Sequence, residues 1–385
     1  MRDFDIVIYG ATGFTGRLVA EYLTQTYPSG VRWAMAGRSL AKLQEVRDLI
    51  GAPADTPLVT AESDDPASLR AMADRATVVI STVGPYQLYG SALVAACAAT
   101  GTGYVDLCGE PAWMRHMIDA HEGEATRTGA RIVFSCGFDS IPFDLGVLTL
   151  QDAAKAKYGI PAPRVKGRVR TMQGTFSGGT AASLKATLAA AARDPGIVKL
   201  LTSPFALTPG FQGPHQPTGL LPEYDATLSA WVAPFVMAPI NTKNVHRTNF
   251  LLGEAYGADF VYDEMMVAGL GDVGKAAAAA IAKFNPFSGD KGPKPGEGPS
   301  KEERDAGHYD LLFVGIMPDG ERIDAVVTGD RDPGYGSTSK MIAEAALCLV
   351  QDVEGDGGIW TPGALMGTKL RDRLVAKAGL SFTVG

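Results

Sequence analysis

The stretch that decides the fold of this 385-residue chain is Gly10-Ala11-Thr12-Gly13-Phe14-Thr15-Gly16. An apolar run at residues 6–8 precedes it and has the composition of a buried strand. Residues 14–27 follow it and place apolar side chains at helical spacing, namely Leu18, Val19, Tyr22 and Leu23. A strand, a tight glycine turn and a helix in this order are typical of a dinucleotide-binding α/β domain.

Each of the three glycines has a physical role in such a turn. Gly10 permits the sharp bend, Gly13 lets backbone N–H groups approach a pyrophosphate, and Gly16 lets the helix pack closely on the sheet. The positive end of the helix dipole then faces the phosphates. We expect the rest of the loop to contact the cofactor as well, that is Ala11, Thr12, Phe14 and Thr15. The spacing is G-x-x-G-x-x-G rather than G-x-G-x-x-G, so a glycine-rich turn without a ligand is the alternative.

The end of the second predicted strand, residues 31–36, indicates which dinucleotide is bound. Domains that prefer NAD place a carboxylate about 20 residues after the loop, where it binds the ribose 2′-hydroxyl. This chain has Arg38 there, and a guanidinium suits a 2′-phosphate. We expect Ser39 and Lys42 to assist it. The sequence therefore predicts NADP(H) rather than NAD(H), and the alternative is that Arg38 is only a solvated residue between a strand and a helix.

Composition limits the class of protein. A length of 385 residues favours two domains. The contents of 46% hydrophobic and 20% charged residues are ordinary for a folded protein, and the formal net charge of −7 argues against general binding to nucleic acid. We expect buried thiols, with no metal site and no disulfide framework, because the cysteines are far apart and lack histidines at ligand spacing: Cys97, Cys108, Cys136 and Cys348.

These features predict a cytoplasmic protein. The first strand is expected almost at the N-terminus, which leaves no room for a signal peptide. No apolar run reaches the ~18 residues that a membrane-spanning helix needs. Residues 228–240 are apolar and include Trp231, Phe235 and Met237. They could lie against lipid as a peripheral contact, or against a hydrophobic substrate, and burial within a second domain is the commoner explanation.

Short apolar runs alternate with helical segments through the first third of the chain. We predict strands at residues 2–9, 31–36, 58–61, 77–81, 104–107 and 132–135. The helices between them are expected at residues 14–27, 41–50, 66–74, 91–99 and 112–128. Apolar strands joined by helices indicate a parallel sheet covered on both faces. The fold class is therefore α/β, with an N-terminal Rossmann domain built on a doubly wound parallel sheet.

The remainder of the chain predicts a second α/β domain with a mostly antiparallel sheet. Charged and apolar residues alternate, as in strands with one wet face, at residues 164–172, 259–266, 308–317 and 321–328. Helices are expected at residues 142–157, 337–349 and 361–376. We assign residues 1–140 to NADP binding, 141–335 to substrate binding and a homodimer contact, and 336–385 to helices that pack back on the Rossmann domain.

Residues 285–307 are rich in Gly, Pro, Lys and Glu and are expected to form a surface loop. The length of this loop allows two interpretations, a lid or a disordered excursion.

Ligands of parallel α/β sheets bind outside the carboxyl ends of the strands, so the residues that follow each strand are candidate ligand contacts. Glu62 and Ser63 follow the third strand and are expected near the adenine. The nicotinamide half is expected beside the loop after the fourth strand, which contains Val83, Gly84 and Pro85. Cys108 and Gly109 follow the fifth strand and are expected to approach the cofactor at the mouth of the site. A plain turn without ligand contact is the alternative for each.

Hydride transfer is the cofactor's chemistry, and the protein aligns the reactants and supplies a proton. The candidates for polarising a carbonyl or donating that proton are Tyr86, Asp139, Ser140 and Tyr335. Tyr335 and Lys340 are five residues apart, so they do not form the Tyr-x-x-x-Lys pair of short-chain dehydrogenases. Cys108 follows a strand but lacks an identifiable base, and we expect an inert thiol.

Several of these motifs together resemble the saccharopine dehydrogenase-like oxidoreductases and, within them, the branch of the trans-acting enoyl reductases. The resemblance covers nearly the whole chain and is most specific in the nucleotide domain. It is carried by residues 8–16, 36–38, 83–86, 104–110, 137–142, 177–180 and 332–341. The resemblance implies a Rossmann domain with NADP(H), a second α/β domain, and reduction of a carbon–carbon double bond in a lipid or polyketide intermediate.

Two other functions stay open at the level of sequence. One is reductive amination of the saccharopine type, in which a dicarboxylic amino-acid adduct calls for several arginines. Between Arg170 and Arg304 the only arginines are Arg193 and Arg247, whereas residues 200–240 are rich in apolar and aromatic groups, which favours an elongated apolar substrate. The other is a scaffold or redox sensor that binds the dinucleotide without turnover.

Overall fold

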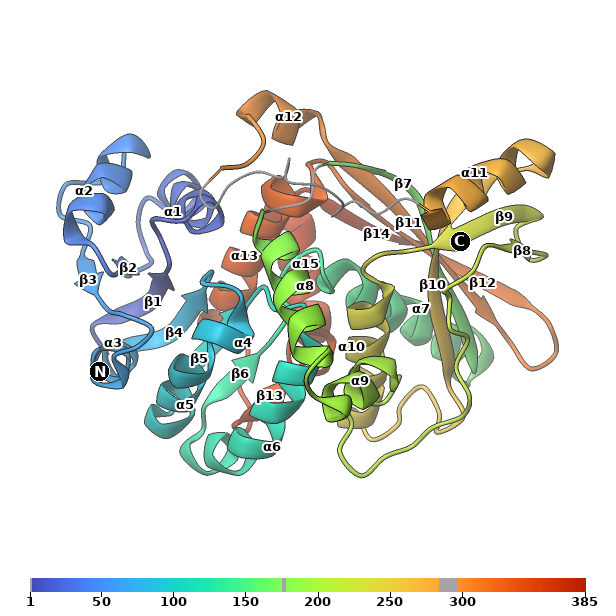
Figure 1. Cartoon of the computed structure of the whole chain (residues 1–385), viewed down its shortest axis with the longest axis horizontal. Helices are drawn as coiled ribbons and strands as arrows, with labels where there is room; N and C mark the ends of the chain where they lie inside the picture. Colours follow the sequence, from blue (N-terminus) through green and yellow to red (C-terminus); the bar gives the residue numbers. More distant parts are fainter. Residues whose placement is uncertain (1, 175–177, 284–296) are drawn as a thin grey trace.

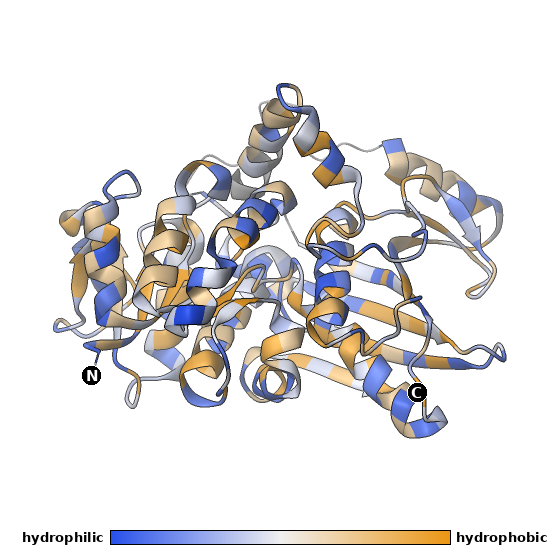
Figure 2. Ribbon diagram, turned by 90° about the horizontal axis from the view of Figure 1, so that it is seen from below, coloured by the Kyte–Doolittle hydropathy of each residue, from blue (hydrophilic) through white to orange (hydrophobic). Residues whose placement is uncertain are grey.

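The computed structural model describes residues 2–174, 178–283 and 297–385. These residues form two seven-stranded sheets, which lie on opposite sides of the view in Figure 1 with helices packed around them. Apolar residues concentrate in the strands of both sheets, whereas hydrophilic residues are frequent in the loops and on the outer helices (Figure 2). One buried apolar cluster joins residues of both sheets, such as Ile8 and Phe313, and a second cluster, which includes Val7, belongs mainly to the first sheet and its helices.

The first sheet is parallel at every pair and has the strand order β13-β6-β5-β4-β1-β2-β3. Its strands are β1 (Phe4–Tyr9), β2 (Trp33–Gly37), β3 (Leu58–Thr60), β4 (Ala76–Ser81), β5 (Gly103–Asp106), β6 (Arg131–Val133) and β13 (Gly358–Trp360). Ile6, Val7 and Ile8 are fully buried because helices cover both faces of β1. The predicted doubly wound Rossmann sheet is confirmed.

The helices of this half begin after the strand ends that bear the candidate ligand contacts. They are α1 (Phe14–Thr26), α2 (Leu40–Leu49), α3 (Pro66–Arg75), α4 (Tyr86–Tyr89), α5 (Ser91–Thr100) and α6 (Pro111–Thr128). The Asp65 carboxylate accepts a hydrogen bond from the Ala67 N–H and caps α3, which has Pro66 at its start. Only the short α4 was missing from the prediction.

The second sheet is antiparallel except where β7 pairs with β10, and its order is β14-β12-β11-β7-β10-β9-β8. Its strands are β7 (Arg164–Gln173), β8 (Glu223–Asp225), β9 (Ala230–Pro234), β10 (Val261–Gly269), β11 (His308–Ile316), β12 (Arg322–Gly329) and β14 (Leu380–Val384). The predicted mostly antiparallel sheet is confirmed. The helix α7 (Ile141–Tyr158) leads from the first sheet and packs on β11 and β12.

Four further helices belong to the middle of the chain: α8 (Gly178–Ala191), α9 (Pro195–Thr202), α10 (Ala238–Leu251) and α11 (Gly271–Lys283). Ser300 precedes the short α12 (Lys301–Ala306) and forms a reciprocal cap with Glu303. Ser177 and residues 285–296 of the expected surface loop lie outside the described residues. Within the described ranges, no helix has the length and apolar character to cross a bilayer.

The C-terminal segment contributes to both sheets. A π-helical turn (Pro333–Ser337) leads into α13 (Thr338–Gln351), which packs on α1 and β4. The chain continues through β13, α14 (Pro362–Leu365), α15 (Gly367–Arg373) and a second π-helical turn (Leu374–Ala378) to β14. The strands β13 and β14 were not expected, because the sequence of this segment indicated only helices. We retain the domain limits at residues 140 and 335 as a proposal.

Candidate functional site

A cavity of about 1280 Å³ lies between the two halves of the molecule and is lined by residues of both. Its nucleotide-side wall includes residues of the 10–16 loop and of the loops after β2, β4, β5 and β6, and its other wall comes from α8, α10, β10 and residues 216–220. Small-molecule sites in proteins usually measure roughly 300–1,000 Å³. The cavity is therefore large enough for more than a small metabolite.

The glycine loop adopts a conformation that larger residues could not. Gly10 has a φ of +90°, and a Cβ at this position would lie 2.7 Å from the Thr82 Oγ1 atom. A Cβ on Gly16 would lie 2.2 Å from the carbonyl oxygen of Gly10, so α1 can start this close to the turn only with glycine. Gly16 and Ala11 are buried under the loop, whereas the cavity is lined by Gly10, Thr12, Gly13, Phe14 and Thr15.

The N-terminus of α1 offers its backbone N–H groups to the cavity. Within the described residues, no side chain caps this helix at Gly13, and no acidic residue lies in its first turn. Such an end binds phosphate through unpaired N–H groups and the helix dipole. The Phe14 ring is fixed by edge-to-face contact with Tyr335, at a centroid distance of 4.7 Å. These residues fit the diphosphate of a dinucleotide.

Arg38 lies at the end of β2, is exposed, and lines the cavity. No carboxylate in the described part of the chain forms an ion pair with it, so its guanidinium is available for a 2′-phosphate. Ser63 lines the same end of the cavity. Ser39 instead caps α2, because its hydroxyl accepts from the Lys42 N–H at 3.4 Å.

Besides Ala11, Gly16 and Ser39, three further predicted cofactor contacts lie away from the cavity wall: Lys42, Glu62 and Cys108. Lys42 and Glu62 are exposed side chains on the surface. Cys108 is fully buried, its sulfur accepts a hydrogen bond from the Glu110 N–H, and burial raises the pKa of its thiol well above the ordinary value. The expected inert thiol agrees with this environment. Among the described residues, no cluster of histidine, cysteine and carboxylate side chains is arranged to hold a metal ion.

The loops after β4 and β5 meet at the cavity, where Val83, Gly84, Pro85 and Gly109 line it. Tyr86 also lines it, but its hydroxyl donates to the Ser81 carbonyl and accepts from the Leu107 N–H, both at 3.1 Å. Burial raises the pKa of Tyr86 well above the ordinary value. The geometry thus gives the Tyr86 hydroxyl a role in joining two strand ends, and we no longer favour it as proton donor.

Asp139 is the candidate acid that the cavity exposes. It follows β6, is half-buried, and lines the cavity, and no hydrogen bond to its carboxyl group occurs among the described residues. Burial raises the pKa of Asp139 to about 7. A carboxyl group of this kind is protonated in part of the population at neutral pH, as a proton donor requires.

Ser140 and Tyr335, the two other candidates, occupy different positions. Ser140 is fully buried behind the wall, where its hydroxyl donates to Asn241 Oδ1 and accepts from Asn244 Nδ2, each at 2.8 Å. Tyr335 is buried and lines the nucleotide end of the cavity beside Phe14. The structure therefore brings Asp139 and Tyr335 to the cavity and leaves Ser140 outside it.

The second half supplies polar cavity residues that sequence reasoning missed. Lys243 and His246 on α10 line the cavity, as do Tyr262 and Glu264 on β10. Glu264 accepts hydrogen bonds from Asn241 Nδ2 at 2.9 Å and from the Tyr262 hydroxyl at 2.8 Å. Burial raises the pKa of Glu264 well above the ordinary value, which favours the neutral acid.

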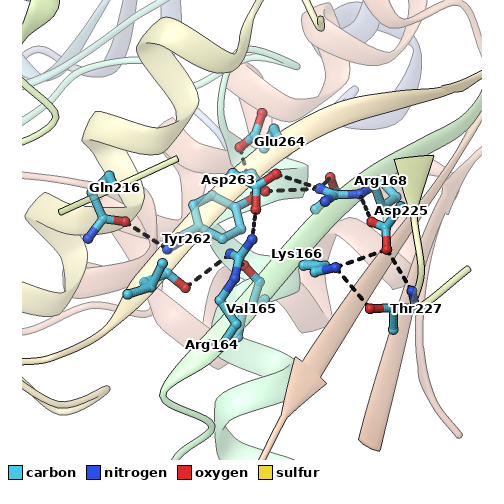
Figure 3. Close-up of polar contacts among 12 residues, drawn as sticks. Arg164, Val165, Lys166, Arg168, Gln216, Asp225, Thr227, Tyr262, Asp263 and Glu264 are labelled. Atoms are coloured by element: carbon cyan, nitrogen blue, oxygen red, sulfur yellow. Dashed lines mark hydrogen bonds and ion pairs between the residues drawn. The ribbon is translucent and has the colours of Figure 1, made fainter. Parts of the chain in front are cut away.

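A buried ion network lies beside these residues and joins three strands of the second sheet (Figure 3). Arg168 is fully buried and donates to Asp225 at 2.9 Å and to Asp263 at 2.8 Å, while Lys166 also donates to Asp225 at 2.9 Å. Although burial opposes the effect, Lys166 and Arg168 lower the pKa of Asp225 to about 2. These charges are committed to one another, so Arg168 is a structural residue and not a substrate contact.

Comparison with known proteins places the chain in a family. A protein of Mycobacterium tuberculosis with the provisional name of trans-acting enoyl reductase is 42% identical over 99% of this chain and 97% of its own length. The trans-acting enoyl reductase of Mycobacterium leprae is 38% identical over 97% of this chain and 96% of its own. This chain belongs to the trans-acting enoyl reductase family.

Two further comparisons agree with this family assignment. Residues 6–133 match the NADP-binding domain of saccharopine dehydrogenase. Apo saccharopine dehydrogenase (L-Glu forming) from Saccharomyces cerevisiae has the same fold, with a TM-score of 0.57 and 10% identity over 99% of this chain and 100% of that one. This member of the trans-acting enoyl reductase family is therefore an NADP-dependent oxidoreductase, as the loop and Arg38 predicted.

Proposed function

We propose that this protein reduces the carbon–carbon double bond of an α,β-unsaturated acyl substrate of the lipid or polyketide type. The family supports an enoyl reductase, and the cavity supports an acyl substrate. The observation that carries the proposal is the set of apolar cavity-lining residues that the second half of the molecule contributes, namely Leu188, Leu201, Leu220, Phe235, Val236, Met237 and Ile240. An elongated hydrocarbon can bury its surface against such a wall.

The cavity is poorly suited to reductive amination of a dicarboxylic amino acid. Recognition of two or more carboxylates calls for arginines that donate paired hydrogen bonds. Arg38 is the single arginine among the described lining residues, and it belongs to the nucleotide end. Arg168 on β7 is already paired with Asp225 and Asp263.

The residues of the chain have separate tasks in this proposal. The 10–15 loop and the N-terminus of α1 would hold the diphosphate of NADPH, Arg38 would hold its 2′-phosphate, and Val83 to Pro85 with Gly109 would contact its nicotinamide half. NADPH, when bound, supplies the hydride that the β-carbon accepts. Asp139 then donates its proton to the α-carbon and recovers one from water.

The test is an NADPH-consumption assay with the purified protein. The probe is the trans-2-dodecenoyl thioester of N-acetylcysteamine, and mass spectrometry identifies the product. We expect the saturated thioester in an amount equal to the NADPH consumed. Consumption with butanal and glutamate, and none with the thioester, would instead support amination. Binding of NADPH without turnover of either would support a scaffold.

A further inference from the structure

Lys243 is a buried cation for which the described residues provide no counter-ion. It lies on α10, lines the cavity, and is only 4% exposed. Its ammonium donates one hydrogen bond, at 2.9 Å, to the carbonyl oxygen of Pro239 in its own helix. No carboxylate lies within 4.0 Å of it in the part of the chain that the structure describes. Two of its three N–H donors are therefore left for another partner.

The other buried cations in the second half of the molecule, in contrast to Lys243, have carboxylate partners. Arg168 is paired with two aspartates, and Arg247 donates to Glu122 and to the carbonyl oxygens of Leu207 and Ile359. Burying an ammonium without an opposite charge is unfavourable, and burial lowers the pKa of Lys243 to about 8. A position that keeps such a cation at a cavity wall is suited to a ligand that brings the missing negative charge.

His246 adds a second unsatisfied polar group beside it. It follows Lys243 by three residues, so both side chains lie on the same face of α10 and line the cavity. Its Nε2 atom is buried and has no hydrogen-bond partner among the described residues. The rings of Phe205 and Phe260 pack against the imidazole, with centroids at 4.7 and 5.8 Å. Burial and the charge of Lys243 keep His246 neutral.

We propose that Lys243, with His246 beside it, forms an oxyanion subsite that binds the carbonyl oxygen of the acyl substrate. This inference rests on the proposed function, because the acyl carbonyl is what gains charge in that reaction. A neutral imidazole with its proton on Nε2 donates one further hydrogen bond to the same oxygen.

The electron flow explains why a cation is useful there. As the β-carbon accepts the hydride, the electron pair of the C=C bond forms a new double bond between the α-carbon and the carbonyl carbon. The carbonyl π pair moves onto the oxygen, which becomes negative and is held by the N–H groups of Lys243. The electron pair on the oxygen then re-forms the carbonyl π bond, and the electrons of the double bond between the α-carbon and the carbonyl carbon bind the proton that Asp139 donates to the α-carbon. Donors fixed in a site that excludes water stabilise such a charge strongly.

The test compares Lys243→Met with Lys157→Met, which removes an exposed lysine on α7 that does not line the cavity. The first readout is binding of dodecanoate, an acyl chain with a full anionic charge, to the protein without substrate. We expect Lys243→Met to weaken it about 10- to 100-fold, as for loss of a charged hydrogen bond. The second readout is kcat for the dodecenoyl thioester, expected to fall ~100- to 1,000-fold with NADPH affinity unchanged. Lys157→Met should change neither.

The two proposals fail in different ways. If the wild type does not reduce the thioester but binds dodecanoate through Lys243, the proposed function is wrong and the anion subsite stands. If Lys243→Met binds dodecanoate and turns over the thioester like the wild type, the subsite is refuted. Lys243→Gln provides the same measurements if the Met variant does not fold, and Lys243→Arg should recover part of the binding because it restores a cation.

Discussion

Arg38 tests the cofactor assignment with a single side chain. We predict that Arg38→Ala weakens NADPH binding by ~1.5 to 3 kcal/mol, because the variant loses a charged hydrogen bond to the 2′-phosphate. NADH lacks that phosphate, so its affinity should barely change. Calorimetric titration of both cofactors measures the difference, with Arg70→Ala on the exposed face of α3 as the control. Equal losses for NADPH and NADH would contradict the assigned role.

Asp139 tests the identity of the proton donor. We predict that Asp139→Asn lowers kcat for the enoyl thioester ~100- to 10,000-fold while NADPH still binds, because the amide cannot supply the proton. Burial raises the pKa of Asp139 to about 7, and the acid is the active form. The wild-type kcat should therefore fall as pH rises through about 7. A residual rate in the variant that keeps the same step near pH 7 would assign the titration to another group.

The buried carboxyl group of Glu264 in the cavity wall should make the free energy of unfolding depend on pH. Its pKa in the folded state is raised by burial, whereas an unfolded glutamate titrates near about 4.3. The folded protein favours the neutral form of Glu264 more than the unfolded chain does. The stability of the folded state is therefore highest, with respect to this group, below about pH 4.3, and it decreases as the pH rises through the folded-state pKa. Glu264→Gln mimics the neutral form. We predict that it unfolds at higher urea concentration than the wild type at pH 8, with a smaller difference at pH 5.

The control for this prediction is Glu45→Gln, at an exposed position on α2. It should change the urea midpoint little at either pH. A Glu264→Gln variant that is equally destabilised at pH 5 and pH 8 would show that the carboxyl group is ionised in the folded protein.

The sequence allowed us to predict those functional residues that occur at a fixed spacing after a predicted strand. The loop at 10–16 and Arg38 were predictable, because each follows a strand at a spacing that the fold dictates. Lys243, His246 and Glu264 were not, because polar side chains on a helix or strand usually indicate a wet face. Their burial depends on packing between α10 and β10, which are separate elements in the sequence. The partners of Ser140, which are Asn241 and Asn244, also come from distant positions.

At the scale of elements, the nucleotide loop can form only if α1 packs closely against the turn at Gly10. A Cβ on Gly16 would meet the backbone of Gly10 at 2.2 Å, and a backbone atom cannot move aside as a flexible side chain can. We predict that Gly16→Ala lowers stability by roughly 1–3 kcal/mol, as overpacking does. It should also abolish binding of NADPH and NADH alike, unlike Arg38→Ala.

A second glycine on a helix serves as the control for this element. Gly123 lies within α6, and a Cβ there would meet no atom within 4 Å. Gly123→Ala should therefore raise the free energy of unfolding by up to ~1 kcal/mol through helix propensity. Urea unfolding of both variants and titration with both dinucleotides provide the measurement. Normal NADH binding by Gly16→Ala would show that the close approach is not required.

At the scale of the molecule, α8 and α10 connect the nucleotide domain to the second sheet around one cavity. Ser183 on α8 donates to Glu110 at 2.7 Å, and Gln87 donates to Thr187 of the same helix at 3.0 Å. Figure 1 shows α8 between the two sheets. The two-sheet architecture was predictable from the strand patterns, but this arrangement was not, because contacts between domains leave no periodic signal in the sequence.

The central claim is that the cavity brings an enoyl group to the nicotinamide of NADPH. The most direct test uses NADPH with deuterium at C4 of the nicotinamide, prepared separately with each stereochemistry, and the dodecenoyl thioester. The account predicts that one of the two forms places a single deuterium on the β-carbon of the saturated product, as seen by NMR. A saturated product without deuterium from either form, or deuterium at the α-carbon, would contradict it.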